Sequence, residues 1–531
     1  MARSLAALSL SLSLLVLGGC KGDPSTPAYW ERALEKSRRP EDRVRVLEEL
    51  GASEHLKAPL LPLLHAQLTE EKSPEVRSAI ARTLGQLKDP SSAKPLAEAL
   101  QMGNTQAATG GVNREIITAL ASIGDPSSAP VLVKLLGGSD GYTRVDAIQA
   151  LGAMRAPEAV EPLLALAEDE REEPFINKKA IEALGRLRAA RAVPVLVRMM
   201  TRERRGVSFY TESSFALFQV GAPAAEALLP VLAGKDLALT AWSRKQGINP
   251  ASYYFKSAQV LGDLREPRAE PALLERLRYT DREPGLQAIV RVHAAEALGR
   301  LRAGAARAPL SGMLHEAEPA VRDAYVNALV QLGGRESLPA LEKSAASGNW
   351  FAREVAVKGL AQLGDARELT VLDALSAAEP DRTKKECAEL DYEGCQDVAR
   401  LGAAHAAEIA SYKRTLEAAR GCAEEPGCWA GKLKDSDRSV VERAARELTR
   451  APGAAAVDAL LTRVKDPDSA IRSHVIQALD FLVATAPEAR TRASAQVASL
   501  EKQLVDEKGS TAFQQVNEDL RRLIVRLQPQ L

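Results

Sequence analysis

Apolar residues recur along most of this chain with the spacing of an α-helix. In the stretch from Val290 to Leu310, "VRVHAAEALGRLRAGAARAPL", they occupy one helical face, then a Gly- and Ala-rich turn follows, then a second apolar run. Similar stretches begin at Val76 and Thr143. Each of them predicts two helices joined by a short turn, which is an αα-hairpin.

The hairpins share one register. We number each unit from its first apolar helix position, i, and positions i, i+4, i+8 and i+11 then lie on one helical face. Units begin at Asp42, Val76, Val112, Thr143, Ile176, Phe209, Tyr253, Val290, Val321, Ala352, Val440 and Ile471. Every unit has leucine at i+8: Leu50, Leu84, Leu120, Leu151, Leu184, Leu217, Leu261, Leu298, Leu329, Leu360, Leu448 and Leu479. A lone hairpin of about 31 to 37 residues cannot bury both faces, so stacking into a solenoid is predicted.

Glycine, proline and arginine recur at fixed places in the unit. Glycine at i+12 fits a helix C-cap with positive φ (Gly124, Gly221, Gly333, Gly364), whereas glycine at i+9 would let helices approach closely (Gly51, Gly85, Gly152, Gly185, Gly262, Gly299). Proline at i+14 fits the first turn of the next helix (Pro90, Pro126, Pro157, Pro223, Pro267). Arginine at i+1 would reach a neighbouring acid, such as those at i+13 (Asp89, Asp125, Glu266, Asp365), or loop carbonyls. The alternative is an arginine row that binds phosphate or carboxylate.

The repeated pattern V-R-x-x-A-x-x-A-L-G-x-L, followed by D-P and a second helix, resembles HEAT repeats. The short unit is most similar to the phycocyanobilin-lyase-type HEAT-like subfamily. The resemblance covers roughly residues 42–380 and 430–485. It implies an all-α, αα-hairpin superhelical solenoid of about 12–13 HEAT-like repeats, and it is weak evidence for function because such repeats serve many roles.

The N-terminus predicts export and a lipid anchor. Arg3 precedes an apolar run from Leu5 to Leu17, and "LGGC" then ends at Cys20. This ending resembles the lipobox of bacterial lipoproteins, which implies a signal peptide over 1–19 and lipidation of Cys20. A plain secretion signal with an incidental cysteine is the alternative. Lys21 in place of Asp favours the outer membrane of a Gram-negative cell envelope, and residues 20–41 are expected to hold the lipidated cysteine and a tether.

The other four cysteines lie in a long interval between the units at Ala352 and Val440. Export makes disulfides the expectation for Cys387, Cys395, Cys422 and Cys428. Of the three pairings we favour Cys387 with Cys395 and Cys422 with Cys428, while a crossed pairing and a four-thiolate zinc site stay open. The interval predicts a degenerate repeat over 381–430, with a long helix at Val398–Gly421, between repeats at 42–380 and repeats plus capping helices at 431–531.

Signals for catalysis are absent from the sequence. The six histidines form no H-E-x-x-H or similar ligand pair, and no phosphate loop or G-x-S-x-G elbow occurs. We therefore expect no catalytic residues, no metal and no cofactor. Lys plus Arg and Asp plus Glu number 70 each, which disfavours nucleic acid as a partner.

The polar side of the first helices is the candidate binding surface. Position i+6 carries Glu48, Arg82, Thr118, Gln149, Glu182, Phe215, Gln259, Glu296, Asn327, Lys358, Arg446 and Gln477. Mixed charge suits protein recognition, although a solvated face without a partner has the same composition. The predicted partner-binding residues are Arg82, Gln149, Glu182, Gln259, Glu296, Asn327 and Lys358, together with Trp242 in an insertion over Leu237–Pro250.

Taken together, these patterns predict a non-catalytic scaffold. It is anchored by lipid at Cys20 and binds envelope proteins on the concave face of the solenoid. The rival hypothesis is an enzyme or enzyme subunit of the HEAT-like lyase type, with a ligand pocket near the insertions, at Trp242 or His405.

Overall fold

The computed structural model describes residues 23–52, 59–101, 107–138, 140–314, 318–346, 350–388, 392–507 and 509–528. Cys20 lies outside these residues, so the lipidation site stays a prediction. The chain divides into two compact units, Met1–Val220 and Gly221–Leu531. No helix among the described residues has the length and apolar character needed to cross a membrane.

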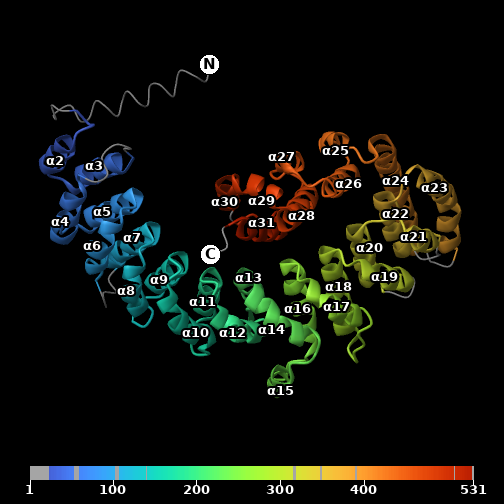
Figure 1. Cartoon of the computed structure of the whole chain (residues 1–531), viewed down its shortest axis with the longest axis horizontal. Coiled ribbons are helices and arrows are strands. Elements are labelled where there is room, and N and C mark those ends of the chain that lie inside the picture. The colour runs from blue at the N-terminus through green and yellow to red at the C-terminus, as the bar shows by residue number, and fades with distance from the viewer. Residues whose placement is uncertain are drawn as a thin grey trace. The chain divides into compact units, whose positions relative to one another are not determined.

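The first unit is a succession of helix pairs (Figure 1). Its described residues include a short β-hairpin whose strands pair antiparallel. Its elements are α2 (Pro27–Lys36), α3 (Pro40–Ala52), α4 (Leu61–Glu70), α5 (Pro74–Leu87), α6 (Ala93–Glu98), α7 (Ala107–Ile123), α8 (Ala129–Leu135), α9 (Gly141–Ala153), α10 (Val160–Glu168), α11 (Pro174–Arg186), α12 (Val193–Met199), β1 (Glu203–Arg204), β2 (Val207–Ser208) and α13 (Tyr210–Val220).

The second unit continues the same arrangement. Its helices are α14 (Ala222–Leu232), α15 (Leu237–Lys245), α16 (Ala251–Leu264), α17 (Glu270–Arg276), α18 (Pro284–Leu301), α19 (Arg307–Met313), α20 (Pro319–Leu332), α21 (Leu338–Ala345), α22 (Trp350–Leu363), α23 (Ala366–Cys387), α24 (Tyr392–Cys422), α25 (Pro426–Lys432), α26 (Arg438–Leu448), α27 (Ala454–Leu461), α28 (Ser469–Thr485), α29 (Pro487–Ser494), α30 (Val497–Asp506) and α31 (Gln514–Leu527).

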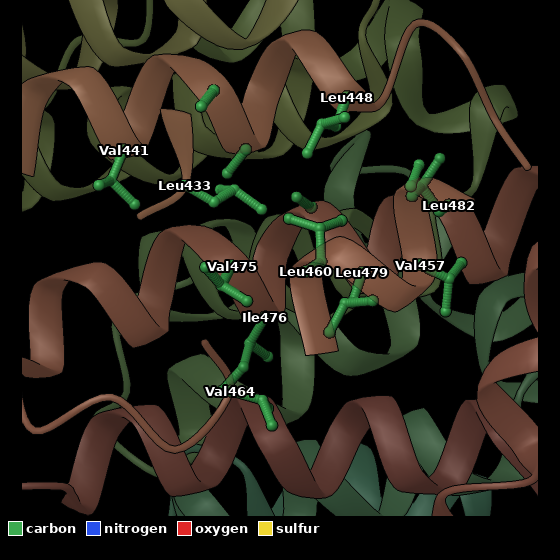
Figure 2. Packing of buried hydrophobic residues seen from close by; sticks show 14 of the residues in the cluster. Leu433, Val441, Leu448, Val457, Leu460, Val464, Val475, Ile476, Leu479 and Leu482 are labelled. Carbon is green, nitrogen blue, oxygen red and sulfur yellow. The ribbon is translucent and has the colours of Figure 1, made fainter. Parts of the chain in front are cut away.

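The predicted register is confirmed. Within each unit the first helix of one repeat packs on the first helix of the next, as α5 does on α7 and α16 does on α18. All twelve leucines at i+8 are buried, with exposed fractions of 1% or less. In the C-terminal repeats, Leu448 of α26 and Leu479 of α28 share a core with Leu460 of α27 and Leu482 (Figure 2). This continuous apolar core is what holds stacked hairpins together.

The glycines at i+9 allow adjacent first helices to come into close contact. A Cβ on Gly262 would lie 2.9 Å from the Cα of Ala297 in α18, closer than packed atoms approach. Four other pairs repeat this geometry: Gly85 with Ala119, Gly152 with Ala183, Gly185 with Ala216 and Gly299 with Ala328. The missing side chain therefore sets the spacing of the helices.

Replacing Gly262 with alanine is expected to destabilise the second unit by about 1 to 2 kcal/mol, because overpacking outweighs the gain in helix propensity. Gly285 in α18 is the matched control, since no atom lies within 4 Å of an added Cβ. Gly285→Ala is expected to stabilise by up to about 1 kcal/mol. Urea titrations of both variants measure the difference, and equal effects would contradict the close approach.

The ends of the first helices follow the prediction only in part. Gly124, Gly221 and Gly333 have φ between 68° and 77°, as expected for C-caps, but Gly364 does not, because Asp365 starts α23 directly after it with a capping box. Five units whose glycine is at i+9 place a basic residue at i+12 with φ between 49° and 56°: Lys88, Arg155, Arg188, Arg265 and Arg302. These left-handed residues were not predicted from the sequence.

Most of the i+14 prolines start a short 3₁₀ helix rather than the second α-helix. Pro90, Pro126, Pro157 and Pro267 begin such turns. Three of the four acids at i+13 cap these turns instead of pairing with the arginines at i+1: Asp89, whose carboxylate accepts from Ser91 N at 2.9 Å, Asp125 and Glu266. The predicted pairing of these two positions is therefore wrong.

The arginines at i+1 contact loop carbonyls and other acids. Arg291 and Arg322 donate to the carbonyls of Tyr279 and Leu314, each at 2.8 Å. Arg472 pairs with Glu507 at 2.7 Å. These contacts join helices and loops, as the structural interpretation of the arginine series predicts.

The N-terminal segment is more structured than a tether. Residues 27–36 form α2, which packs on α3 and buries Tyr29, Trp30, Ala33 and Leu34. The expectation of a tether through residue 41 is wrong for this helix, because its apolar side chains supply an amphipathic face.

The two insertions and the C-terminal segment are helical. The first insertion forms the short helix α15, and α24 and α25 form the degenerate repeat between α22 and α26. The long helix begins at Tyr392 rather than Val398. α30 and α31 are the capping helices, and α31 packs on α28 with Leu520 and Leu523 buried.

The cysteines pair locally. Cys387 is bonded to Cys395 and Cys422 to Cys428, with Cα–Cα distances of 4.5 and 5.3 Å. This is the pairing that the sequence analysis favoured, so these thiols do not form the alternative zinc site.

Candidate functional site

A polar cavity of about 440 Å³ lies within the second unit. Its lining comes from the first helices α16, α18, α20, α22, α26 and α28, and from α31. No residue of the second helices α17, α19, α21 or α27 lines it. The polar faces of the first helices are therefore the ones that converge.

The predicted partner-binding residues fall in three places. Glu296, Asn327 and Lys358 line the cavity. Gln259 does not line it, but lies on α16 shortly before the lining residue Gly262. Trp242 lies on α15, half-buried. The remaining three belong to the first unit: Arg82, Gln149 and Glu182.

The cavity residues that the sequence predicted contact one another and their neighbours. Lys358 Nζ donates to Asn327 Oδ1 at 3.3 Å and lies 3.9 Å from a carboxylate oxygen of Glu442. Glu296 accepts from His293 Nδ1 at 3.0 Å. Burial opposes ionisation of Glu296, but the His293 contact and Arg300 hold its pKa below the usual value. These side chains form a hydrogen-bonded polar surface.

One wall of the cavity is a network of ion pairs between distant repeats. Asp480 of α28 accepts from Arg265 at 2.9 Å and from Arg526 at 2.8 Å. Asp263 of α16 contacts Arg300 at 2.5 Å and Arg522 of α31 at 3.0 Å.

Because Asp480 is buried, its pKa would rise, but Arg526 and Arg265 hold it below the usual value. The network joins α16 and α18 to α28 and α31.

Arg302 and Arg446 of the cavity lining belong to a basic cluster that sequence reasoning did not identify as a site. Four arginines gather around the end of α26, and we call them, with one glutamate, the arginine cluster: Arg302, Arg443, Arg446, Arg450 and Glu447. Arg446 is one of the residues at i+6 that the sequence analysis considered. The other arginines of the cluster are at other positions of the repeat, and Arg302 is at the end of α18.

Asp519 of α31 gives the cavity a pH-dependent group. Burial raises the pKa of Asp519 to about 6, against the attraction of Arg522 and Arg300. An ordinary aspartate has a pKa of about 3.9. Between these values the folded protein keeps a proton that the unfolded chain has released, so the free energy of unfolding falls as pH rises from about 4 to 6.

Asp519→Asn removes this titration. Relative to the variant, the wild type is expected to lose about 2 kcal/mol of stability between pH 4.5 and pH 7.5. Denaturant unfolding of both proteins at the two pH values measures the change. A constant difference between them would show that folding does not raise the pKa of Asp519.

The rival hypothesis placed a pocket near Trp242 or His405, and neither residue lines this cavity. His405 of α24 is buried, and burial lowers its pKa while Glu379 opposes the change. Among the described residues, no three His, Cys, Asp or Glu side chains are grouped as metal ligands.

Comparisons with known proteins agree with the architecture. A model of HEAT repeats matches residues 28–109, 132–208, 285–361 and 310–390, and a model of the PBS lyase HEAT-like repeat matches residues 112–138. No catalytic family is indicated. A search of curated proteins found no match.

Solved structures with similar folds include two of the karyopherin Kap121p. The structure bound to the extreme C-terminus of the protein phosphatase Cdc14p has a TM-score of 0.50 and 15% identity, and covers 99% of this chain and 64% of that chain. The structure bound to Nup53p has a TM-score of 0.50 and 15% identity, and covers 98% of this chain. This chain thus spans less than two thirds of the karyopherin, at 64% and 62%. The chain is a HEAT-repeat protein that folds as an all-α solenoid.

Proposed function

We propose that this chain is a non-catalytic scaffold that binds other proteins through the polar faces of its first helices. It is anchored by lipid at Cys20 in the outer membrane of a Gram-negative bacterium, and its partners are proteins of the same envelope. The observation that carries the binding function is the convergence of Glu296, Asn327 and Lys358 on one cavity that the second helices do not line. Mixed charges on such a surface select a partner and its register.

The similar solved structures support protein binding as the function class. The Kap121p chains hold the C-terminus of Cdc14p in one structure and Nup53p in another. Low identity limits this likeness to the fold, so the partner surface of this chain is argued from its own residues. A solenoid offers an extended face to a partner, and its second helices provide a natural control surface.

The test is affinity capture from the organism's own envelope with a matched pair of variants. Lys358→Glu reverses a charge in the cavity, and Lys343→Glu reverses one on the exposed face of the second helix α21. We expect Lys358→Glu to lose specific partners that the wild type and Lys343→Glu retain. Identical capture by all three proteins would reject the cavity as the partner surface.

The anchor is tested separately. Growth with a labelled fatty acid is expected to label the wild-type protein and not Cys20→Ser, and the variant is expected to leave the outer-membrane fraction. An unlabelled wild-type protein would reject lipidation while leaving the partner assay unaffected.

A further inference from the structure

The arginine cluster carries more positive charge than its own residues neutralise. Glu447 is 6% exposed and is shared by Arg446 and Arg450, each at 2.8 Å, and by Arg443 at 3.6 Å. Arg302 adds a fourth guanidinium, and among the described residues no carboxylate lies within ion-pair distance of it. Four cations and one anion remain.

Part of this charge has a structural explanation. Arg443 donates to the carbonyl of Ala361 at 2.6 Å, and Arg446 donates to that of Gln362. Both carbonyls belong to the last turn of α22, where a helix carries partial negative charge. These contacts fix Arg443 and Arg446 in place, but each Nε is buried without a hydrogen bond.

Arg302 is held in a fixed orientation in the cavity. Its guanidinium lies 3.4 Å from the ring centroid of Phe481 and donates to Thr449 Oγ1 at 2.6 Å. Thr449 Oγ1 in turn donates to the carbonyl of Arg446 at 2.6 Å. The stacked ring and the hydroxyl pre-organise the guanidinium, which lowers the entropic cost of binding a ligand there.

The electrostatics favour an anion at this place. Burial, together with repulsion from Arg265 and Arg446, lowers the pKa of Arg302 to about 10. Elsewhere in the lining, Asp263 and Asp480 each contact two arginines, so their carboxylates are locally neutralised. An anion near Arg302 therefore meets a guanidinium that no carboxylate of the described residues pairs, while Asp263 and Asp480 are already held by other arginines.

We propose that Arg302 and Arg446, with Thr449 orienting Arg302, form a binding site for the oxyanion of a small ligand, a phosphate or a carboxylate. All three line the cavity, whose volume of about 440 Å³ is within the range of small-molecule sites. The planar guanidinium groups match the geometry of either oxyanion. This site does not depend on the protein-binding function.

Isothermal titration calorimetry of the full chain tests the site, with inorganic phosphate in one arm and succinate in the other. Ionic strength is matched with chloride because exposed charges are screened. Arg302→Gln is the test variant. Arg492→Gln is the control, since Arg492 is half-exposed, pairs with Asp458 at 2.7 Å and does not line the cavity.

We expect one of the two anions to bind the wild type and the control equally, and the Kd to rise roughly tenfold or more in Arg302→Gln. Arg302→Lys keeps the positive charge but not the planar guanidinium group. It is expected to lose less affinity for the anion than Arg302→Gln. Thermal unfolding checks that each variant is folded. Absence of binding at millimolar concentrations of both anions, or an equal loss in Arg492→Gln, would overturn the proposal.

Discussion

Arg353→Met is expected to destabilise the second unit by about 3 to 5 kcal/mol, because it leaves the buried carboxylate of Glu379 with only the distant guanidinium of Arg382, at 4.0 Å. Arg353 is 1% exposed and Glu379 is 3% exposed, and their side chains meet at 2.9 Å. Arg353 also contacts Glu386 at 3.0 Å. Chemical denaturation followed by circular dichroism measures the loss.

Two further variants separate the buried pair from a general effect of losing charge. Arg367→Met removes an arginine that is 76% exposed on α23, the helix that carries Glu379, and its expected effect is within about 0.5 kcal/mol. Adding Glu379→Leu to Arg353→Met is expected to restore much of the stability, since an apolar pair avoids the desolvation cost. A double variant as unstable as Arg353→Met would argue against this ion-pair explanation.

The sequence predicted this arginine but not its partner. Arg353 is at i+1 of its repeat, where the series of arginines is visible without a structure. The acid at i+13 of that repeat, Asp365, pairs with Arg335 instead. Glu379 lies on the second helix, and its contact with Arg353 depends on how the two helices pack, which a one-dimensional register does not contain.

The cavity could not be predicted from the sequence, for a related reason. The register predicted the helices and their buried leucines because these depend on contacts within and between neighbouring repeats. Arg265 and Asp480, by contrast, are 215 residues apart in the chain. Their contact follows from small rotations that accumulate over several repeats, and no single repeat encodes that sum.

Part of the candidate site was predicted from the sequence. Glu296, Asn327 and Lys358 were selected by their common place at i+6, and the structure brings them to one cavity. Arg446 has the same register position but was not selected, since a mixed series gives no reason to prefer it. Arg302 was not predicted from the sequence. An arginine with a left-handed backbone conformation at i+12 gives no sequence signal as clear as that of a glycine.

Leu298→Ala is expected to destabilise the second unit by about 2 to 5 kcal/mol. Leu298 is at i+8 of its repeat and is fully buried in α18. Removing its methyl groups loses apolar burial and leaves a cavity between stacked helices that relax only partly. Denaturant unfolding gives the free energy, and hydrogen exchange shows which helices lose protection.

Leu237 on α15 provides the control, because it is an exposed leucine in the same unit, with 76% of its side chain accessible. Leu237→Ala is expected to change stability by less than about 0.5 kcal/mol. Since repeats couple to their nearest neighbours, the Leu298 variant should lose protection first in α18 and in the adjacent first helices α16 and α20. Equal stability of the two variants would show that position i+8 does not face the core, and the register on which every repeat boundary rests would then be wrong.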